Sequence, residues 1–573
     1  MTEIKESIGR IDRRRLLYAD GWVIAVSMLV TTGIIVWLNS VRAEVATPES
    51  VRIFLSLILF QDLPAAVLML ALLPLGLMSV LREIGLKLVS WCGQHPWTLF
   101  ATTVLALAVG VQVVYHAHPL AMDEYAAVFQ SRVFAAGQLH GQLPPVLVDL
   151  LVPPGFQGHF LGVSHETGHV ASMYWPGFSL LMTPFAWLGL GWLTNPVLGG
   201  LAVFLVHRVT LQLTESLDAA GFAALLTIAS PAVSVNAISF YSMTGHLVCN
   251  LAFVLLLLRP TLLRSVAAGF VGSVALVLHN PVPHMLVALP WLLWLFGQRN
   301  AFRLLAGALL GYAPLCILAG LGWWHVLAEL TVVGASTAPQ VNGGDWMTVW
   351  TARLGAIDVF RVPALNTLED RLMALAKMWI WAVPGMLVVS LLGLRRSGHD
   401  VRVRLLAWSA VATLVGFLFV PVDQGHGWGF RYFHAAWFTL PILSTVAIWP
   451  TREGKSDSTD GQERLAGTLA ACALFSLVVM TGVRAVQVER FISDHLAQLP
   501  ATDAESTELI IVRAGRGYYA ADLVQNDPFL RERPVIVWSR GNADEERRVK
   551  QYFQGVTLVG ETAVATAWGR PDR

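Results

Sequence analysis

The chain has 573 residues, of which 55% are hydrophobic and only 13% are charged, against the roughly 25% that is usual for soluble domains. The formal net charge of +1 shows no excess of basic residues, so nothing in it suggests a nucleic-acid partner. The cysteines, Cys92, Cys249, Cys316 and Cys472, are too scattered for a disulfide framework or a CxxC zinc pattern. This composition indicates a polytopic membrane protein.

Apolar runs that approach the length of a bilayer-spanning helix, about 20 residues, recur along most of the chain. The uncharged stretch 177–206 is expected to cross once, after an interfacial or re-entrant helix that ends at a break at Asn195-Pro196. No small-residue cleavage site follows the first apolar run, so we expect it to be retained as a helix. We predict thirteen membrane-spanning helices, at 20–39, 63–81, 97–115, 198–212, 219–240, 243–258, 264–279, 282–298, 303–325, 372–394, 403–421, 432–450 and 465–484.

Basic residues gather at the cytoplasmic ends of membrane helices. Arg13 to Arg15 therefore place the N-terminus in the cytoplasm, and the later basic clusters then fall on the same side. This assignment leaves three large segments outside, at 116–176, at 326–371 and after residue 485.

The tail differs in composition from the rest of the chain. The stretches "ELIIVRAG", "PVIVWSR" and "VTLVGETAVATAW" have the pattern of short strands, and "ADEERRVKQYFQ" has that of a helix between two of them. The tail is therefore expected to form a small α/β domain outside the membrane.

The first outer segment contains "HETGH", an H-E-x-x-H pattern made by His165, Glu166 and His169. In zinc proteases a helix places both histidines on one face beside the glutamate. Here Gly168 weakens such a helix and Pro176 ends it soon afterwards. A zinc protease, another divalent-metal site and an ordinary polar loop all remain possible for this stretch.

An acidic pair, Asp123-Glu124, stands where the chain leaves the third predicted helix and opens an amphipathic run. Acidic residues at this place are suited to cap a helix. Ionisable groups at the membrane edge are also often functional. Successive residues of a helix lie about 100° apart, so the two carboxylates are not expected to be equivalent.

The pair is followed in order by "AAGQL", "YWPGFSLLMTPF", "SPAVSVNAISFYSMTGH" and "GHGWGFRYFHAAWFTLPIL". This succession resembles the GT-C glycosyltransferases, and most closely the bacterial branch of the protein O-mannosyltransferase and lipid A aminoarabinose transferase families. The resemblance covers roughly residues 95–450 and implies a GT-C-like bundle there. Together with the hydropathy and strand patterns, it leads us to expect an all-α polytopic fold with about thirteen spanning helices and a small C-terminal α/β extracytoplasmic domain. The expected parts are an N-terminal segment with two extra helices (1–95), a transmembrane catalytic core (96–485) and the small domain (486–573).

The resemblance further implies an inverting glycosyltransferase of the bacterial cytoplasmic membrane. Such an enzyme takes a sugar from a polyprenyl-phosphate-linked donor and passes it to a hydroxyl of a glycan, lipid or protein at the outer face. No cofactor is required for this chemistry, although the "HETGH" stretch could hold a divalent metal. A transporter or flippase of lipid-linked substrates is the alternative, and it would be expected to show paired repeats.

Each predicted site residue has an expected role. Asp123 is the expected general base, with Glu124 as the second catalytic carboxylate. The donor phosphate is assigned to Arg431, with Lys377 and Tyr432 as further candidates, because a guanidinium matches phosphate oxygens bidentately. The sugar or acceptor is expected to contact Tyr174, Trp175, His279, Asn280 and His284.

Overall fold

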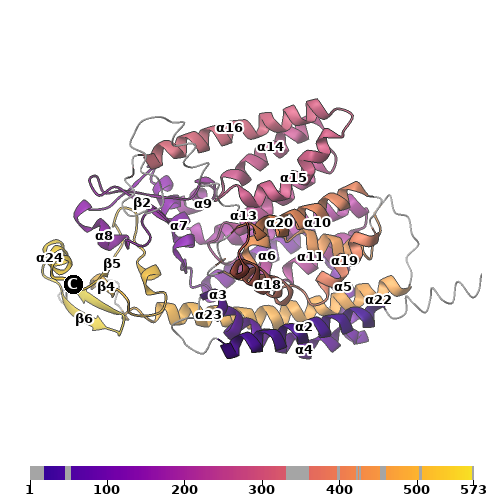
Figure 1. Ribbon diagram of the computed structural model, residues 1–573, viewed down its shortest axis with the longest axis horizontal. Coiled ribbons are helices and arrows are strands. Elements are labelled where there is room, and N and C mark those ends of the chain that lie inside the picture. The colour runs from indigo at the N-terminus through magenta and orange to yellow at the C-terminus, as the bar shows by residue number, and fades with distance from the viewer. Residues whose placement is uncertain are drawn as a thin grey trace, which may run out of the picture.

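The computed structural model describes residues 19–44, 53–328, 330, 361–396, 400–420, 424, 427–451, 460–501 and 506–570. Helices form most of the molecule, and a small mixed sheet lies at one end of the helical bundle (Figure 1). In chain order the helices that build the bundle and its outer segments are α2 (Ala19–Glu44), α3 (Ile53–Leu57), η2 (Ile58–Asp62), α4 (Leu63–Leu72), η3 (Leu73–Leu77), α5 (Ser79–Gln94), α6 (Pro96–Val113), α7 (Met122–Ala135), η4 (Pro145–Leu147), α8 (Val148–Leu151), α9 (Gly177–Trp187), η5 (Gly191–Leu193), α10 (Thr194–Thr214), α11 (Leu217–Ile228), α12 (Pro231–Asn236), α13 (Met243–Leu257), α14 (Leu262–Val277), α15 (Val282–Phe296), α16 (Ala301–Ala328), α18 (Leu365–Ile380), α19 (Met386–Arg396), α20 (Val401–Leu418), η6 (Arg431–Ala436), α21 (Thr439–Val446), α22 (Asp460–Phe475), η7 (Ser476–Met480) and α23 (Thr481–Leu496).

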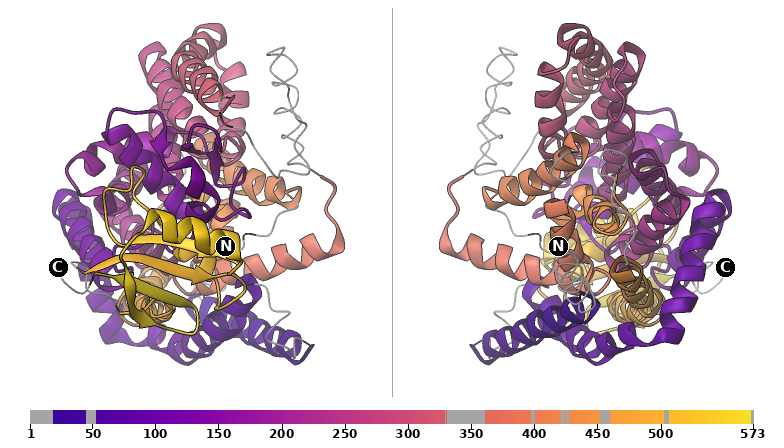
Figure 2. Two further views of the ribbon diagram at one scale, coloured as in Figure 1. Left: turned by 90° about the vertical axis from the view of Figure 1, so that its left-hand side faces the viewer. Right: turned by 90° about the vertical axis from the view of Figure 1, so that its right-hand side faces the viewer.

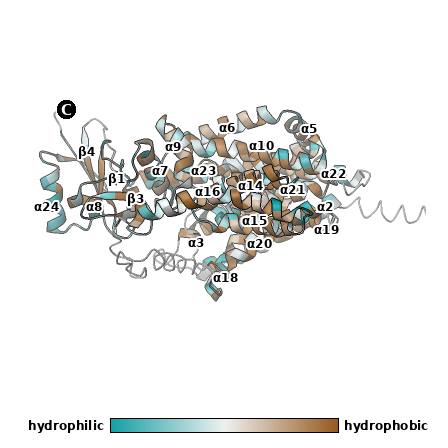
Figure 3. Ribbon diagram, turned by 90° about the horizontal axis from the view of Figure 1, so that it is seen from above, coloured by the Kyte–Doolittle hydropathy of each residue, from teal (hydrophilic) through white to brown (hydrophobic). Residues whose placement is uncertain are grey.

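Among the described residues, 7 helices are long and apolar enough to cross a membrane. They are Asp20–Arg42, Ile53–Leu77, Pro96–Val113, Gly191–Thr214, Ala301–Ala328, Val401–Leu418 and Gly461–Leu496, and shorter apolar helices accompany them. Hydrophobic residues dominate these helices, whereas α24 (Ala543–Tyr552) at the far end of the molecule is mostly hydrophilic (Figure 3). The protein is therefore a polytopic helical membrane protein, as its composition predicts.

Several predicted helices are interrupted in the structure, and prolines explain where. The run 372–394 is divided between α18 and α19, because Pro384 and Gly385, which has a φ of 82°, lie in the break. The run 219–240 is divided at Pro231, which begins α12. A length-and-hydropathy criterion counts each of these pairs as one helix, so the prediction of a single continuous span was wrong at both places.

The uncharged stretch 177–206 has the form expected from its sequence. The short helix α9 precedes a turn at residues 188–190, and α10 then continues to Thr214. Its Pro196 lies in the first turn of α10, where a missing N–H costs little. The break thus comes a few residues before the predicted Asn195-Pro196 position.

The N-terminal helices pack against the last helices of the bundle. In Figure 1, α2 and α4 run beside α22 and α23, and contacts join α2 to α22 and η3 to α22. The last helix continues to Leu496, so the boundary expected at residue 485 falls inside α23. The first and last helices of the bundle thus form one of its sides.

The C-terminal segment forms a four-stranded sheet in the order β5-β4-β7-β6. Its strands are β4 (Thr507–Arg513), β5 (Val535–Ser539), β6 (Thr557–Glu561) and β7 (Ala565–Gly569), and α24 connects β5 to β6. β4 and β5 are parallel, with Leu509 opposite Val535, whereas β7 is antiparallel to both β4 and β6. The strands and helix expected from the alternating pattern are therefore present.

The segment 116–176 folds against this sheet. It contains α7, α8 and a small antiparallel sheet in the order β1-β3-β2, formed by β1 (Gly141–Gln142), β2 (Leu161–Val163) and β3 (His169–Ser172). One buried apolar cluster joins Phe129 of α7 and Leu150 of α8 to Val535 of β5 and Phe553 after α24. Seen from the end, the sheet lies across the ends of the helices (Figure 2, left). Residues about 400 positions apart thus share one core beside the start of α7.

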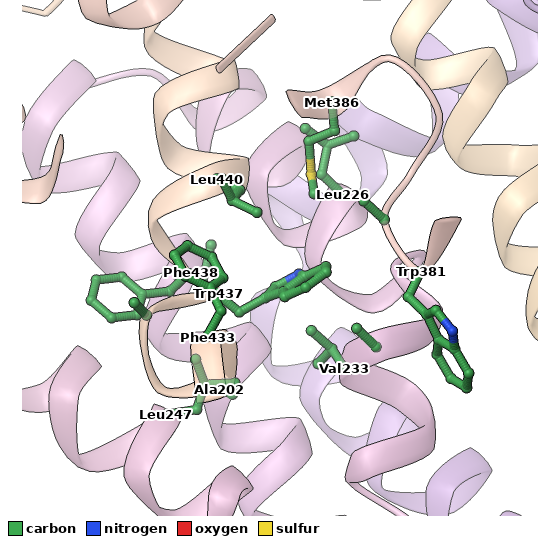
Figure 4. Packing of buried hydrophobic residues seen from close by; sticks show 14 of the residues in the cluster. Ala202, Leu226, Val233, Leu247, Trp381, Met386, Phe433, Trp437, Phe438 and Leu440 are labelled. Carbon is green, nitrogen blue, oxygen red and sulfur yellow. The ribbon is translucent and has the colours of Figure 1, made fainter. Parts of the chain in front are cut away.

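The segment that begins with Arg431 is held by aromatic packing inside the bundle. Trp437 and Phe438 are each 0% exposed and lie among side chains of α10, α11, α12 and α13 (Figure 4). Interiors packed at this density leave side chains few alternative positions. The position of η6, and of Arg431 at its start, is therefore fixed by the bundle.

Candidate active site

Asp123 and Arg431 meet at the end of the helical bundle. Both terminal nitrogens of the Arg431 guanidinium donate to Oδ2 of Asp123, each at 3.0 Å. The side chain of Asp123 is 22% exposed and that of Arg431 is 13% exposed, so the pair is largely but not fully buried. Charge-assisted bonds of this kind are stronger than neutral ones. The pair thus places a carboxylate next to a guanidinium, a cation that is well suited to bind phosphate.

Three rings surround this ion pair. The hydroxyl of Tyr174 donates a short hydrogen bond to Oδ1 of Asp123. The ring of Tyr174 lies 4.0 Å from that of His279 between their centres. The guanidinium of Arg431 lies over the ring of Tyr241, 4.3 Å from its centre, in a cation–π contact. These contacts fix the orientation of both charged groups.

Glu124 points away from Asp123 into the protein. It is 0% exposed, and its oxygens accept hydrogen bonds from the Tyr115 hydroxyl at 2.8 Å, from the Leu120 N–H at 2.6 Å and from the Phe240 N–H at 3.3 Å. Its bond to the backbone just before α7 resembles the back-bond of a capping box. Of the two acidic residues that the sequence offered for capping this helix, Glu124 therefore has that structural role and Asp123 does not.

The hydrogen bonds of Glu124 continue toward the segment that carries Arg431. Tyr115 accepts at its hydroxyl from Nε1 of Trp428 at 3.0 Å, and the Trp428 carbonyl accepts from Asn236 at 2.9 Å. Hydrogen bonds between buried polar groups make the local conformation specific. Glu124 is thus connected to the position of Arg431 through Trp428, three residues earlier.

The backbone before η6 is shaped to accommodate the arginine. The side-chain oxygen of Gln424 accepts from the backbone N–H of Arg431 at 3.1 Å, and the backbone carbonyl of Gln424 accepts from Nη1 of Arg431 at 3.2 Å. Gly427 has a φ of 147°, and a Cβ there would stand 2.3 Å from Cδ of Arg431. A side chain at residue 427 would therefore displace the guanidinium from Asp123.

The C-terminal segment contributes directly to the start of α7. Oδ1 of Asp522 accepts a hydrogen bond from the N–H of Met122 at 2.7 Å, one residue before Asp123. The Asn526 N–H donates to the hydroxyl of Tyr125 at 2.8 Å, and Gln525 donates to the carbonyl of Pro119 at 2.6 Å. The first N–H groups of a helix need such external acceptors. The small domain thus holds the helix end on which Asp123 lies.

The charges of the site change the acidities of its members. Burial raises the pKa of Asp123, but Arg431, His279 and the Tyr174 hydrogen bond outweigh it, so the pKa lies below its usual value. Burial outweighs the hydrogen bonds of Glu124 and raises its pKa to about 7. Asp123 is therefore the ionised carboxylate of the site at neutral pH.

The "HETGH" stretch forms the turn of a β-hairpin and not a helix. Ser164 and His169 close the turn between β2 and β3, and Gly168 has a φ of 75° there. His165 bonds Asp149 at 2.8 Å, whereas His169 stacks on His140 with ring centres 4.9 Å apart. Within the described part of the chain no group of three or more metal-ligating side chains stands together. The geometry of a zinc protease, which requires one helix face, is therefore not formed.

Two other predicted residues of the site lie in polar clusters of their own. The Nζ of Lys377 donates to Asp62 at 2.8 Å and is buried, so this ammonium belongs to an ion pair inside the bundle. His284 is 1% exposed and bonds Asn250 and the Tyr312 hydroxyl, each at 2.7 Å. Neither has a hydrogen bond to the Asp123–Arg431 pair among the described contacts.

The remaining predicted residues make other contacts. The Asn280 side chain accepts from the N–H of Val282 at 3.1 Å, in the turn that leads into α15. Tyr432 stacks on Phe417 with ring centres 4.7 Å apart. Trp175 is partly buried, next in the chain to Tyr174. The residues brought together with Asp123 are therefore Arg431, Tyr174 and His279.

Three functional groups of the site were missed by sequence reasoning. Gln424 and Tyr241 lie in or next to motifs that had been singled out, and a polar or aromatic residue there was a usable signal. Asp522 gave no signal, because nothing in its local sequence connects it to a helix 400 residues earlier.

This arrangement defines a class: a polytopic membrane protein with a carboxylate–guanidinium pair at the end of its bundle, beside a small mixed domain. The fold is similar to that of ArnT from Cupriavidus metallidurans in its crystal structure bound to undecaprenyl phosphate, with a TM-score of 0.50 and 13% identity, over 82% of this chain and 98% of that one. The apo structure of the same protein gives 0.46, 13%, 82% and 97%. No protein-family model and no curated protein matches the chain. The GT-C fold expected from the motifs is therefore present.

Proposed function

We propose that this protein is an inverting glycosyltransferase that moves a sugar from a polyprenyl-phosphate-linked donor to a hydroxyl acceptor. The observation that carries the proposal is the partly exposed Asp123–Arg431 pair at the end of a GT-C bundle. It supplies a base and a phosphate-binding group within one site. The undecaprenyl phosphate bound by the ArnT relative supports a donor of this class.

In the proposed reaction, Asp123 takes the proton of the acceptor hydroxyl as its oxygen attacks the anomeric carbon. The bond between that carbon and the phosphate oxygen breaks, and the electron pair leaves with the polyprenyl phosphate. Attack from the face opposite the leaving group inverts the anomeric centre. Arg431 binds the departing phosphate, because the planar fork of guanidinium N–H groups can donate to two phosphate oxygens at once.

The ion pair itself suggests how the base is activated. Arg431 lowers the pKa of Asp123 and so makes this carboxylate a weak base. A donor phosphate that engages the same guanidinium nitrogens would withdraw positive charge from Asp123. The pKa of the carboxylate would then rise, and it would become a better proton acceptor when the donor is bound.

Location and orientation are proposed from the charge distribution. We place the protein in the bacterial cytoplasmic membrane, with the N-terminus in the cytoplasm and the small domain outside. Reporter fusions at Ser456, which lies outside the described residues, and at Asn542 should report opposite sides of the membrane. The same side for both would contradict this orientation.

The proposal is tested by incubating the purified protein with a panel of polyprenyl-phosphate sugars and candidate hydroxyl acceptors. Release of polyprenyl phosphate together with an acceptor bearing a sugar of inverted configuration is the expected result. Movement of the intact lipid between leaflets without cleavage would instead support the transporter alternative. The sugar and the acceptor are identified by the members of the panel that react.

A further inference from the structure

A half-open cavity lies at the end of the bundle opposite the Asp123–Arg431 pair. Its volume is about 460 Å³, and it lies between α10, α13 and the start of α14. The cavity is lined by Arg208, Leu211, Gln212, Leu255, Leu256, Arg259 and Arg264. One part of its wall is thus cationic and another part is aliphatic.

The three arginines of this cavity have no acidic partner among the described contacts. Arg208, Arg259 and Arg264 are exposed, and a hydrogen bond runs from the Arg264 side chain to the carbonyl of Arg259 at 3.3 Å. No acidic residue is among the described lining residues. Like charges gathered around one cavity repel each other unless an anion is bound there.

The position of Arg264 at the start of a helix adds to the positive charge at this cavity. It lies in the first turn of α14, whose N-cap is Thr261. The N-terminal end of a helix carries partial positive charge, so a cation there is unfavourable and an anion is favoured. Arg208 near the end of α10 is favourably placed by the same rule, and the dipoles of the two helices therefore do not explain why both cations face one cavity.

The cavity is separate from the candidate active site. Arg264 and His279 lie near opposite ends of α14, and 15 residues at about 1.5 Å each separate them by roughly 22 Å. Arg208 is similarly distant from the start of α10, where Asn195 bonds the carbonyl of Tyr241. The cavity thus lies at the face of the bundle away from Asp123.

We propose that this cavity binds the phosphate of an anionic phospholipid. Guanidinium groups suit phosphate oxygens, and Leu211, Leu255 and Leu256 offer an apolar wall for the beginning of the acyl chains. Leu262 and Leu263 beside it are 46% and 78% exposed, as expected for side chains that face lipid. Basic pockets between membrane helices are recurrent sites for such headgroups. The site is independent of the proposed sugar transfer.

The test measures retained lipid and needs no enzymatic activity. The full chain is reconstituted in phosphatidylcholine nanodiscs with or without phosphatidylglycerol, and native mass spectrometry counts the lipids that remain bound after transfer to detergent. We expect retention of phosphatidylglycerol by the parent protein. Arg208→Gln, Arg259→Gln and Arg264→Gln should each weaken it about fivefold, and the triple variant about a hundredfold.

Arg303→Gln is the matched control, because Arg303 lies in the first turn of α16 at the same end of the bundle but does not line the cavity. It should retain phosphatidylglycerol as the parent does. The single variants keep the test valid if the triple variant fails to fold, which melting in neutral detergent reveals. Equal retention of phosphatidylglycerol and phosphatidylcholine by the parent, or undiminished retention in the three single variants, would overturn the proposal.

A competition arm distinguishes a lipid from a soluble anion. Inorganic phosphate, added in excess before the lipid count, should leave phosphatidylglycerol bound, because the apolar wall contributes only to lipid binding. Displacement by inorganic phosphate at concentrations similar to those of the lipid would instead identify a site for soluble phosphate and would overturn the lipid assignment.

Discussion

Both terminal nitrogens of Arg431 bind the same oxygen of Asp123, each at 3.0 Å, although the two residues are 308 positions apart in the chain. The other oxygen of Asp123 is bound by Tyr174. Asp123, the proposed proton acceptor, and Arg431, the residue proposed to bind the donor phosphate, are thus paired by charge. Replacement of Arg431 is therefore expected to alter both donor binding and the acidity of the base.

Replacement of Arg431 should affect donor binding first. Arg431→Ala removes the guanidinium that we assign to the donor phosphate, and we expect an affinity loss of at least tenfold. Arg431→Lys should restore binding only in part, because a single ammonium cannot reproduce the planar fork. Titration with a polyprenyl-phosphate sugar measures the affinity, and unchanged binding in the alanine variant would leave Arg431 as a structural partner of Asp123 only.

The same substitution should change the pH dependence of transfer. Arg431 lowers the pKa of Asp123, so the parent carboxylate stays ionised to a lower pH than an isolated one. Without the guanidinium this pKa rises, and the acidic limb of the rate profile should move to higher pH in Arg431→Ala. The profile of kcat/KM against pH tests this, with Arg303→Gln as the control for loss of a distant arginine.

A buried cluster assigns a structural role to Lys377. Asp62 accepts hydrogen bonds from Lys377 at 2.8 Å and from Nε1 of Trp381 at 2.6 Å, and it forms an ion pair with Arg484 at 2.8 Å. The three charged groups lie inside the bundle. Asp62→Asn would leave two cations without a counterion, which should cost about 3–5 kcal/mol of stability. Lys377→Met leaves the Asp62–Arg484 pair intact and should cost clearly less.

Melting in detergent and donor titration together test this assignment. Asp62→Asn should melt at a far lower temperature than Lys377→Met, and Lys377→Met should bind the donor as the parent does. Weak donor binding by a well-folded Lys377→Met variant would instead restore the phosphate role that the sequence suggested for this lysine.

The sequence predicted the features that depend on local pattern. Hydropathy located the bundle, alternation located the strands of the small domain, and motif order located the Asp123 and Arg431 segments. The 100° offset along a helix predicted that Asp123 and Glu124 would face different surroundings, and they do.

What the sequence did not predict depends on contacts between distant segments. The breaks at Pro231 and Pro384 divide helices whose hydropathy is continuous. The pairing of Lys377 with Asp62, and the bond from Met122 to Asp522, join segments 315 and 400 residues apart. Side-chain type alone carries no information about such partners, so a lysine near a helix end could equally be assigned to a phosphate.

Asp522 should act as a positioning residue for the start of α7. Asp522→Leu removes the acceptor of the Met122 N–H and should cost about 1–3 kcal/mol by leaving this buried group unbonded. It should also lower kcat more than it raises KM, because the helix end that holds Asp123 would lose its fixed position. Asp522→Asn retains an acceptor oxygen and should preserve most of the activity, whereas equal losses in both variants would argue against the positioning role.

The titration of Asp522 gives a second readout. Burial raises its pKa from 3.8 to about 7, so the folded state binds this proton more tightly than the unfolded state does. The associated stability is complete below the unfolded value and is lost as the pH rises through about 7. Glu124 is shifted in the same direction. The difference in melting temperature between parent and Asp522→Asn, followed across this interval, isolates the contribution of Asp522.

Asp123→Asn tests the mechanism most directly. The amide retains the shape of the side chain and can still bond Arg431 and Tyr174, but it cannot accept the acceptor's proton at neutral pH. Because Glu124 and Asp522 hold the start of α7, the variant should fold as the parent does. We expect near-parental donor binding and a loss of about 10²–10⁴-fold in the rate of transfer.

Glu124→Gln is the matched comparison at the neighbouring carboxylate. It disturbs the buried bonds to Tyr115, Leu120 and Phe240 and should lower the melting temperature, with a smaller loss of transfer per folded molecule. Single-turnover assays at saturating donor separate the two effects. If Asp123→Asn kept a near-parental rate while Glu124→Gln lost it, the base would be Glu124, and the Asp123–Arg431 pair would serve only to hold the site together.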